Sequence, residues 1–151
     1  MTTFASNSDL IVSYLHSFSK ANPALVASHV TSDFINRHLS ILGAGCEGKE
    51  VYEQRLADFF GSFQGIAYQV SSVVADSRIG AAQYVMTFSV GDKPISISGM
   101  MWFEFKGKLI SKRIDCWDSL NYLMQTGASA SEIENILKKK TVSASTKRAR
   151  A

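Results

Sequence analysis

Asp115 is the strongest candidate for chemistry in this sequence. It lies in a run, 109–117, that otherwise favours an apolar strand. Because residues two apart on a strand share a face, Arg113, Asp115 and Trp117 are expected to lie together. Inside an apolar cavity, a carboxylate beside an indole would have its pKa raised by desolvation, which suits proton transfer near neutral pH. The alternative is a structural salt bridge from Asp115 to Arg113 or Arg37.

His38 is the second catalytic candidate, because an imidazole with an ordinary pKa of about 6.5 can shuttle a proton. With Asp115 it would form a simple proton relay. The alternative is a hydrogen bond from its ring to loop backbone beside Asn36. His16 and His29 are expected at a helix surface or a helix end, and the spacing of the histidines indicates no shared metal site.

Four aromatic side chains are candidates to line a pocket and donate a hydrogen bond to a ligand oxygen: Tyr14, Tyr52, Trp102 and Trp117. An isomerase needs such a donor to stabilise a developing enolate. The alternative is an ordinary aromatic core, which the same spacing also favours. Tyr14 and Trp117 are the preferred pocket members, and Asn36 joins the predicted pocket as a polar residue.

The glycine-rich segment GAGCEG is interpreted as a loop before a helix, since it follows no predicted strand and lacks the spacing of phosphate-binding loops. Cys46 within it is a weaker candidate, as a nucleophile with His38 as its base. The only other cysteine is Cys116, and neither lies in CxxC spacing or near a histidine pair. The sequence therefore predicts two reduced thiols, no disulfide, no metal and no cofactor.

The elements that must position these side chains follow from hydrophobic periodicity. Helices are expected over 8–18, from Pro23 to about residue 30, over 49–62 and from Ser131, where Ser131 and Glu134 would form a capping box; residues 31–47 are interpreted as irregular. Four β-rich runs with short turns between them predict an antiparallel meander: 68–75, 81–90, 95–105 and 109–117. The predicted fold class is α+β, with a curved meander sheet wrapped by N-terminal helices into a cone around an apolar pocket.

The length of 151 residues favours one domain, 1–140, followed by a basic disordered tail, 141–151. Six basic and no acidic residues lie in 138–151, so the remaining charge is 10 − 13 = −3 rather than +3. Without a basic surface on the domain, nucleic acid is not an expected partner. No segment is long and apolar enough for a membrane span, and the N-terminus lacks a secretory pattern, so a cytoplasmic location is expected.

Three features together resemble a known family: the segment HVTSDFINRHLSILGAGCEGKEVYEQRL, the segment GMMWFEFKGKLISKRIDCWDSL, and the order of three helices before a meander. They are similar to the SnoaL-like branch of the nuclear transport factor 2-like superfamily, which includes polyketide cyclases, ketosteroid isomerases and limonene epoxide hydrolases. The resemblance runs from about Ser8 to Gly127. It implies that Asp115 is the acid/base residue, and it places His38 roughly where ketosteroid isomerases have a catalytic aspartate.

Three departures from the family pattern limit what this resemblance implies. The run AAQYVMTFSV lacks the Arg-x-Asp pair of the epoxide hydrolases, and SISGMMWFEF lacks the oxyanion-binding aspartate of the ketosteroid isomerases. One extra residue before Asp118 allows a bulge, and a one-residue slip there would turn Asp115 out of the cavity.

Two functional hypotheses follow. The first is a small, cofactor-independent acid/base enzyme of the isomerase or cyclase type, acting on a hydrophobic carbonyl-bearing ligand. The alternative is a non-catalytic small-molecule-binding or dimeric scaffold domain of the same fold. Either way a homodimer is expected through the outer sheet face, on which four side chains are expected to lie: Ile114, Cys116, Met100 and Tyr84.

Overall fold

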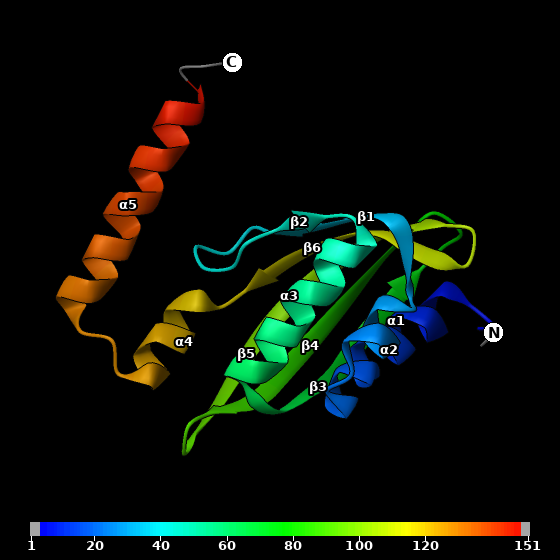
Figure 1. Ribbon diagram of the computed structural model, residues 1–151, viewed down its shortest axis with the longest axis horizontal. Coiled ribbons are helices and arrows are strands. Elements are labelled where there is room, and N and C mark those ends of the chain that lie inside the picture. The colour runs from blue at the N-terminus through cyan, green and yellow to red at the C-terminus, as the bar shows by residue number, and fades with distance from the viewer. Residues whose placement is uncertain (1–3, 149–151) are drawn as a thin grey trace.

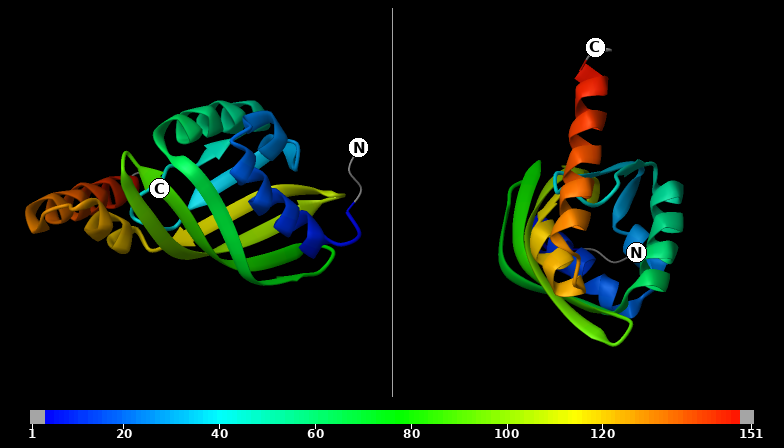
Figure 2. Two further views of the ribbon diagram at one scale, coloured as in Figure 1. Left: turned by 90° about the horizontal axis from the view of Figure 1, so that it is seen from below. Right: turned by 90° about the vertical axis from the view of Figure 1, so that its left-hand side faces the viewer.

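The computed structural model describes residues 4–148, with side chains as far as residue 139, as helices packed on one face of a curved, unclosed sheet (Figure 1 and Figure 2). This is the predicted α+β cone. The elements in chain order are α1 (Asn7–Ser17), η1 (Phe18–Lys20), α2 (Pro23–Ala27), β1 (Val30–His38), β2 (Cys46–Glu47), α3 (Lys49–Ser62), β3 (Gln64–Ala75), β4 (Ile79–Val90), β5 (Lys93–Lys106), β6 (Leu109–Trp117), α4 (Ser119–Thr126) and α5 (Ala130–Arg148).

The sheet has the order β2-β1-β6-β5-β4-β3. The strands β3 to β6 pair antiparallel in sequence order, which confirms the meander. Three of them run for 12 to 14 residues, so the right-handed twist accumulates and bends the sheet around the helices. The strand β1 joins the other edge of β6 in parallel, and β2 pairs with β1.

The strand β1 corrects the prediction that residues 31–47 are irregular. Its inward positions include Phe34, Asn36 and His38, so two of them carry polar side chains that break the apolar alternation expected of a strand. Its partner β6 lies more than 70 residues later in the chain, and no local turn signals the pairing. The helix predicted from Pro23 also ends earlier, at Ala27.

The helices α1 and α3 cover the concave face of the sheet. The Ser6 side chain caps α1 by accepting a hydrogen bond from the Asp9 N–H at 3.1 Å, and α1 buries Leu10, Ile11, Tyr14 and Leu15. Each such burial stabilises the fold by about 1.5–3 kcal/mol for an aliphatic side chain. The helix α3 has the predicted bounds and turns Tyr52 and Leu56 into the core.

The C-terminal helices differ from the prediction in two respects. The helix α4 was not predicted; Asp118 caps it by accepting from the Asn121 N–H at 2.9 Å. The capping box of α5 is Ser129 with Glu132, two residues earlier than the predicted Ser131 with Glu134. The helix α5 projects away from the sheet (Figure 1). Helix continues to Arg148, whereas 149–151 lie outside the described residues; the domain boundary at residue 140 stays a prediction.

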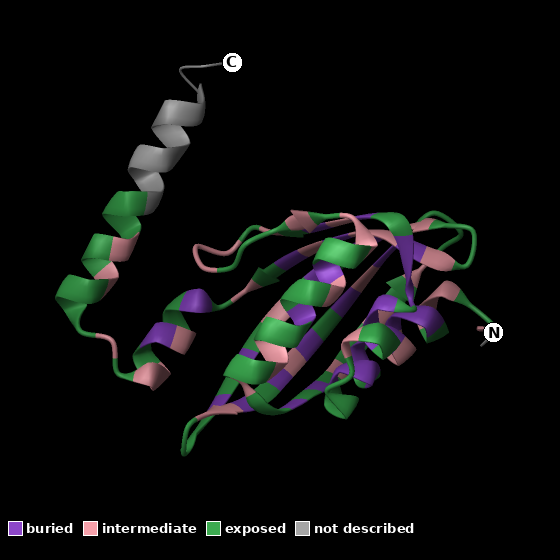
Figure 3. Cartoon of the chain, in the orientation of Figure 1, coloured by how far each residue is buried: buried purple, intermediate pink, exposed green. Residues whose placement is uncertain are grey.

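Buried and exposed residues alternate along the central strands (Figure 3). On the outer face an apolar row crosses four strands, because Val74 pairs with Ala81, Ala81 with Trp102, and Trp102 with Ile114. Over the part of the chain that the structure describes, no helix is both long and apolar enough to cross a bilayer.

Candidate active site

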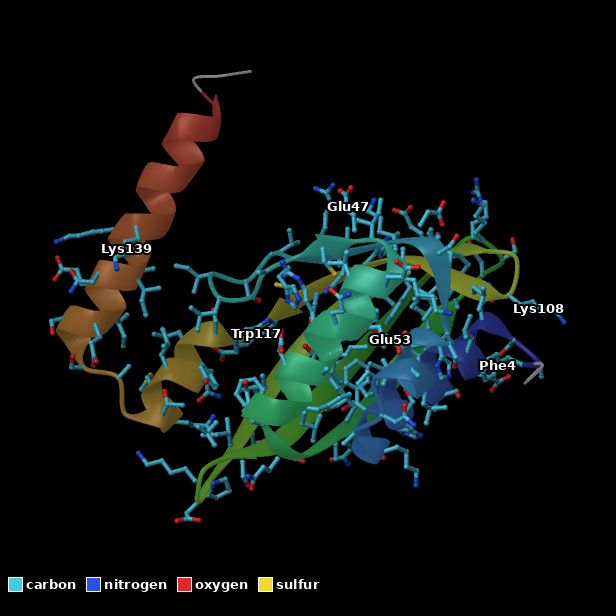
Figure 4. The ribbon with its side chains drawn as sticks, in the orientation of Figure 1. Phe4, Glu47, Glu53, Lys108, Trp117 and Lys139 are labelled. Carbon is cyan, nitrogen blue, oxygen red and sulfur yellow. The ribbon has the colours of Figure 1, made fainter. Side chains whose placement is uncertain are left out.

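A cavity of about 670 Å³ lies between the concave face of the sheet, α3 and the β1–β2 loop. This volume is typical of small-molecule sites. Most of its wall is apolar and includes Phe18, Leu56, Phe63, Met86 and Phe88. Trp117 closes part of it where β6 leads into α4 (Figure 4). The polar and charged lining comes from three elements: Asn36 and His38 on β1, Arg113 and Asp115 on β6, and Arg55, Asp58 and Ser62 on α3.

Asp115 points into this cavity and is 4% exposed. The register shift between β5 and β6 lies before Asp115, between the pairs Phe105–Ile110 and Glu104–Lys112. Pairing is regular from Lys112 to Trp117, so Asp115 keeps its inward position. The Tyr84 hydroxyl donates a hydrogen bond to Asp115 Oδ1 at 2.7 Å. Burial raises the pKa of Asp115, against the opposing effects of the Arg113 charge and the Tyr84 hydrogen bond. The carboxyl group therefore titrates closer to neutral pH than an exposed aspartate.

His38 lies beside Asp115, because the two are direct partners in the parallel β1–β6 pairing. His38 Nδ1 is 3.9 Å from Asp115 Oδ2, and this buried nitrogen has no hydrogen-bond partner in the described part of the chain. Burial, with smaller contributions from the charges of Arg113 and Arg55, lowers the pKa of His38 to about 4. The ring is thus neutral near pH 7 and can accept a hydrogen bond from a protonated Asp115.

The β1–β2 loop, which contains the GAGCEG segment, packs directly on the His38 ring. A Cβ atom at Gly43, where φ is +101°, would lie 2.9 Å from His38 Cγ and Nδ1, so only glycine fits without displacing the ring. Arg55 Nη1 donates to the Ala44 carbonyl at 3.2 Å and ties this loop to α3. The loop therefore packs against the imidazole and limits its movement away from Asp115.

Arg113 also lines the cavity, and its side chain is buried, with 5% of the residue exposed. Its Nε donates to Asn36 Oδ1 at 3.1 Å and its Nη1 to the Tyr14 hydroxyl at 2.7 Å. The Tyr14 and Tyr52 hydroxyls are 2.5 Å apart, and the guanidinium lies about 6 Å from both ring centroids, at 5.9 and 5.8 Å. Burial raises the pKa of both tyrosines, which keeps them protonated.

Five of the predicted site residues line the same cavity: Asp115, His38, Asn36, Tyr52 and Trp117. Tyr14 is fully buried behind Arg113 and reaches the site only through its hydrogen bonds. The placement of Trp102 in the pocket is wrong. It alternates with inward Met101 and Phe103, so it lies on the outer face and is 41% exposed.

Sequence reasoning missed the role of Tyr84 and placed it outward. The residues two and four positions along β4, Met86 and Phe88, are as apolar as any in that strand, and together with Ala82 they define its inward face. Because residues two apart on a strand share a face, Tyr84 belongs to the same inward face as Ala82, Met86 and Phe88. The sequence places Arg113 on the same strand face as Asp115, but it does not indicate the hydrogen bond from Arg113 to Asn36, because residues 31–47 are expected to be irregular.

The hypothesis that Cys46 is a nucleophile receives no support from the geometry. Cys46 lies on β2 opposite Asn36, and burial raises the pKa of its thiol, which leaves it protonated rather than nucleophilic. Among the residues with described positions, no group of three or more His, Cys, Asp or Glu side chains is arranged to hold a metal ion.

Acidification should destabilise the fold through His38. Because its folded pKa is about 4 and its unfolded pKa about 6.5, the unfolded chain binds the extra proton first, and stability is lost as pH falls from 6.5 to 4. The shift corresponds to a loss on the order of 3 kcal/mol. Urea unfolding of His38→Phe should show a shallower decrease of unfolding free energy over this range than the wild type. Parallel pH dependences would show that His38 is not held neutral by burial.

A model of the SnoaL-like domain family matches residues 11–113. Among solved structures, a hypothetical protein with a ketosteroid isomerase-like fold from Catenulispora acidiphila, in complex with trimethylamine, superposes with a TM-score of 0.73. The two are 14% identical over 81% of this chain and 95% of that one. No curated protein sequence matches the chain significantly.

Two further structures have the same fold. A candidate polyketide cyclase from Xanthomonas campestris has a TM-score of 0.69 at 14% identity, over 80% of this chain and 98% of that one. An epoxide hydrolase of the LEH-like type from M. tuberculosis has a TM-score of 0.69 at 13% identity, over 78% and 86% of the two chains. At these identities the similarity establishes the fold, while activity has to be argued from the site.

Proposed function

The chain belongs to the SnoaL-like domain family, and we propose that it is a cofactor-independent acid/base enzyme of the isomerase or cyclase type. Its ligand would be a hydrophobic molecule with a carbonyl group. The observation that carries this proposal is a buried carboxyl group, Asp115, that faces a largely apolar cavity beside a neutral imidazole, His38. Groups with perturbed pKa values that meet in a cavity are typical of acid/base sites.

In the proposed reaction, Asp115 removes a proton from the carbon next to the ligand carbonyl. The C–H electron pair forms a C=C bond while the carbonyl π pair moves onto the oxygen, which gives an enolate, and the proton forms an O–H bond on Asp115. His38 Nδ1, in the tautomer with hydrogen on Nε2, accepts a hydrogen bond from that new O–H after closing the 3.9 Å gap. Return of the proton to a different carbon gives isomerisation. Attack of the enolate carbon on a second carbonyl forms the ring bond and an alkoxide, which takes the proton back from Asp115.

Proton transfer can be tested without knowing the natural substrate. Hydrophobic cyclic ketones incubated with the protein in D₂O should lose their α-proton NMR signals faster than in buffer or with heat-inactivated protein. Ketones that bind, as shown by ligand-observed NMR, but exchange no faster than in buffer would favour the alternative of a non-catalytic small-molecule-binding domain.

We also propose that the protein forms a homodimer through the outer sheet face. Of the four side chains placed there from sequence, Met100 and Cys116 are exposed and Ile114 partly so, whereas Tyr84 lies inside. Met100 (58%) and the outward Trp102 (41%) are paired with Cys116 and Ile114 respectively, which makes a continuous apolar area that a second copy would cover.

Light scattering at micromolar concentration should give twice the chain mass for the wild type. Trp102→Glu should shift the protein to monomer, because it places a charge in the centre of the buried face. Lys108→Glu, at the exposed turn between β5 and β6, is the matched control and should leave the dimer intact. A wild-type monomer at this concentration would refute the proposal.

A further inference from the structure

Arg113 is a buried cation without a counterion in contact. Its side chain partners are the neutral oxygens of Asn36 and Tyr14, and no described carboxylate forms an ion pair with it. Asp115, two residues along the same strand face, acts on it only at longer range. Burying a charge without a paired charge is costly, and an arginine in such a position calls for a reason beyond stability.

The guanidinium keeps N–H groups that no described protein acceptor engages. An arginine has five N–H donors, and the protein acceptors engage one on Nε and one on Nη1. Arg113 also lines the cavity together with Asp115 and His38. Planar N–H donors of this kind bind oxygen anions, and their interaction is strengthened by an apolar, water-poor surrounding.

We propose that Arg113 binds the oxygen anion of the cavity ligand, so that the site selects molecules that carry or develop negative charge on oxygen next to Asp115. This inference rests on the proposed acid/base function and assigns the group that holds the enolate. Asn36 and Tyr14 position the guanidinium. Arg113 thereby takes the place of the oxyanion-binding aspartate that β5 lacks.

Asp115 and Arg113 have complementary roles in the proton transfer: Asp115 takes the proton, and Arg113 binds the oxygen anion that forms. As the α-carbon loses its proton to the Asp115 carboxylate, the negative charge passes from Asp115 to the ligand oxygen, and the net charge of the cavity does not change. Before the step the negative charge acts on Arg113 from the longer range of Asp115, and after it from the ligand oxygen that Arg113 contacts. Donors fixed before the reaction lower the barrier because they need no reorganisation as the charge moves.

Binding of a 1,3-dicarbonyl compound tests this inference without any turnover. The probe is 1-phenylbutane-1,3-dione, whose enolate and enol differ in ultraviolet absorbance, and the comparison ligand is the monoketone 1-phenylbutan-1-one. A titration with saturating protein should show the bound dicarbonyl ionising at least about one pH unit below the free compound, which is a tenfold preference for the enolate. The monoketone should bind at least about tenfold more weakly at pH values where the bound dicarbonyl is ionised.

The variant Arg113→Met, of similar length and without charge, should abolish the shift in ligand ionisation. Arg37→Met is the matched control, since Arg37 is exposed on β1 and paired with Glu47 at 3.7 Å outside the cavity. Asp115→Asn should strengthen enolate binding, because it removes a neighbouring negative charge. Thermal melts establish that each variant is folded. The wild-type titration tests the inference even if a variant does not fold.

The outcomes separate this inference from the proposed function. A bound dicarbonyl that ionises at its free pH, or an unchanged shift in folded Arg113→Met, overturns the role of Arg113 even if ketone exchange is observed. An Arg113-dependent shift without any ketone exchange supports the anion site and contradicts the proposed enzyme alone.

Discussion

Asp115→Asn should abolish ketone proton exchange while leaving the protein folded. Asparagine has the same shape and can still accept the Tyr84 hydrogen bond that now reaches Oδ1 at 2.7 Å. What it loses is the basic oxygen, because an amide does not take up a proton near neutral pH. Removal of a general base of this kind lowers the rate by about 10²- to 10⁴-fold. The measurement is the initial rate of α-deuteration by NMR at saturating ketone.

The matched control is Asp33→Asn, the same substitution on an exposed residue of β1 whose partner is Lys106 at 3.2 Å. It should retain the wild-type exchange rate. Retention of the wild-type rate by Asp115→Asn would remove Asp115 from the mechanism.

Stability distinguishes loss of catalysis from loss of structure in this variant. Because burial raises the folded pKa of Asp115 above its unfolded value, the carboxyl group stabilises the fold below the unfolded pKa, and this contribution is lost as pH rises through the folded pKa. Asparagine does not ionise, so the stability of Asp115→Asn does not decrease in this way as pH rises. Its melting temperature relative to the wild type should therefore increase as pH is raised from 4 to 7.

Gly99→Ala should impair both stability and catalysis, although Gly99 does not line the cavity. A Cβ atom there would overlap the Tyr84 hydroxyl and lie 3.0 Å from the Cys116 carbonyl oxygen, so the tyrosine has to move. Overpacking of this kind costs about 1–3 kcal/mol. Displacing Tyr84 also removes its hydrogen bond to Asp115, which raises the pKa of that carboxyl further.

The catalytic consequence of Gly99→Ala is a shifted pH profile. Since exchange requires ionised Asp115, the acid limb of the rate should move to higher pH, and Tyr84→Phe should produce the same shift without the overpacking. Gly61→Ala is the matched control, because a Cβ at that position of α3 meets no atom within 4 Å. It should stabilise the protein by about 0.4–1 kcal/mol and leave the profile unchanged. An unshifted profile in folded Gly99→Ala and Tyr84→Phe would show that the hydrogen bond does not tune Asp115.

The meander and α3 were predictable because their signals are local. Short polar turns separate the strands β3 to β6, and the stripe of Tyr52 and Leu56 repeats with helical spacing. The inward orientation of Asp115 also follows from alternation, since the bulge in β6 falls before Lys112 and does not disturb the strand beyond it.

The polar half of the site was less predictable, for a physical reason. The strand β1 places Asn36 and His38 at inward positions, where a strand pattern would require apolar residues, and its pairing with β6 closes a long loop with no local marker. Features that break a local rule are expected at functional sites. Residue spacing likewise gives no indication that Arg113 binds Asn36 and Tyr14, because these contacts join three distant parts of the chain.

Titration of the Asp115 side-chain carboxyl carbon by NMR tests most directly whether this residue is a proton-transfer group. The resonance is assigned by its absence from the Asp115→Asn spectrum. The account predicts an inflection clearly above the ordinary aspartate pKa of about 3.9, coincident with the acid limb of ketone exchange. An inflection at or below the ordinary value would show a permanently ionised, structural carboxylate and would contradict the acid/base function.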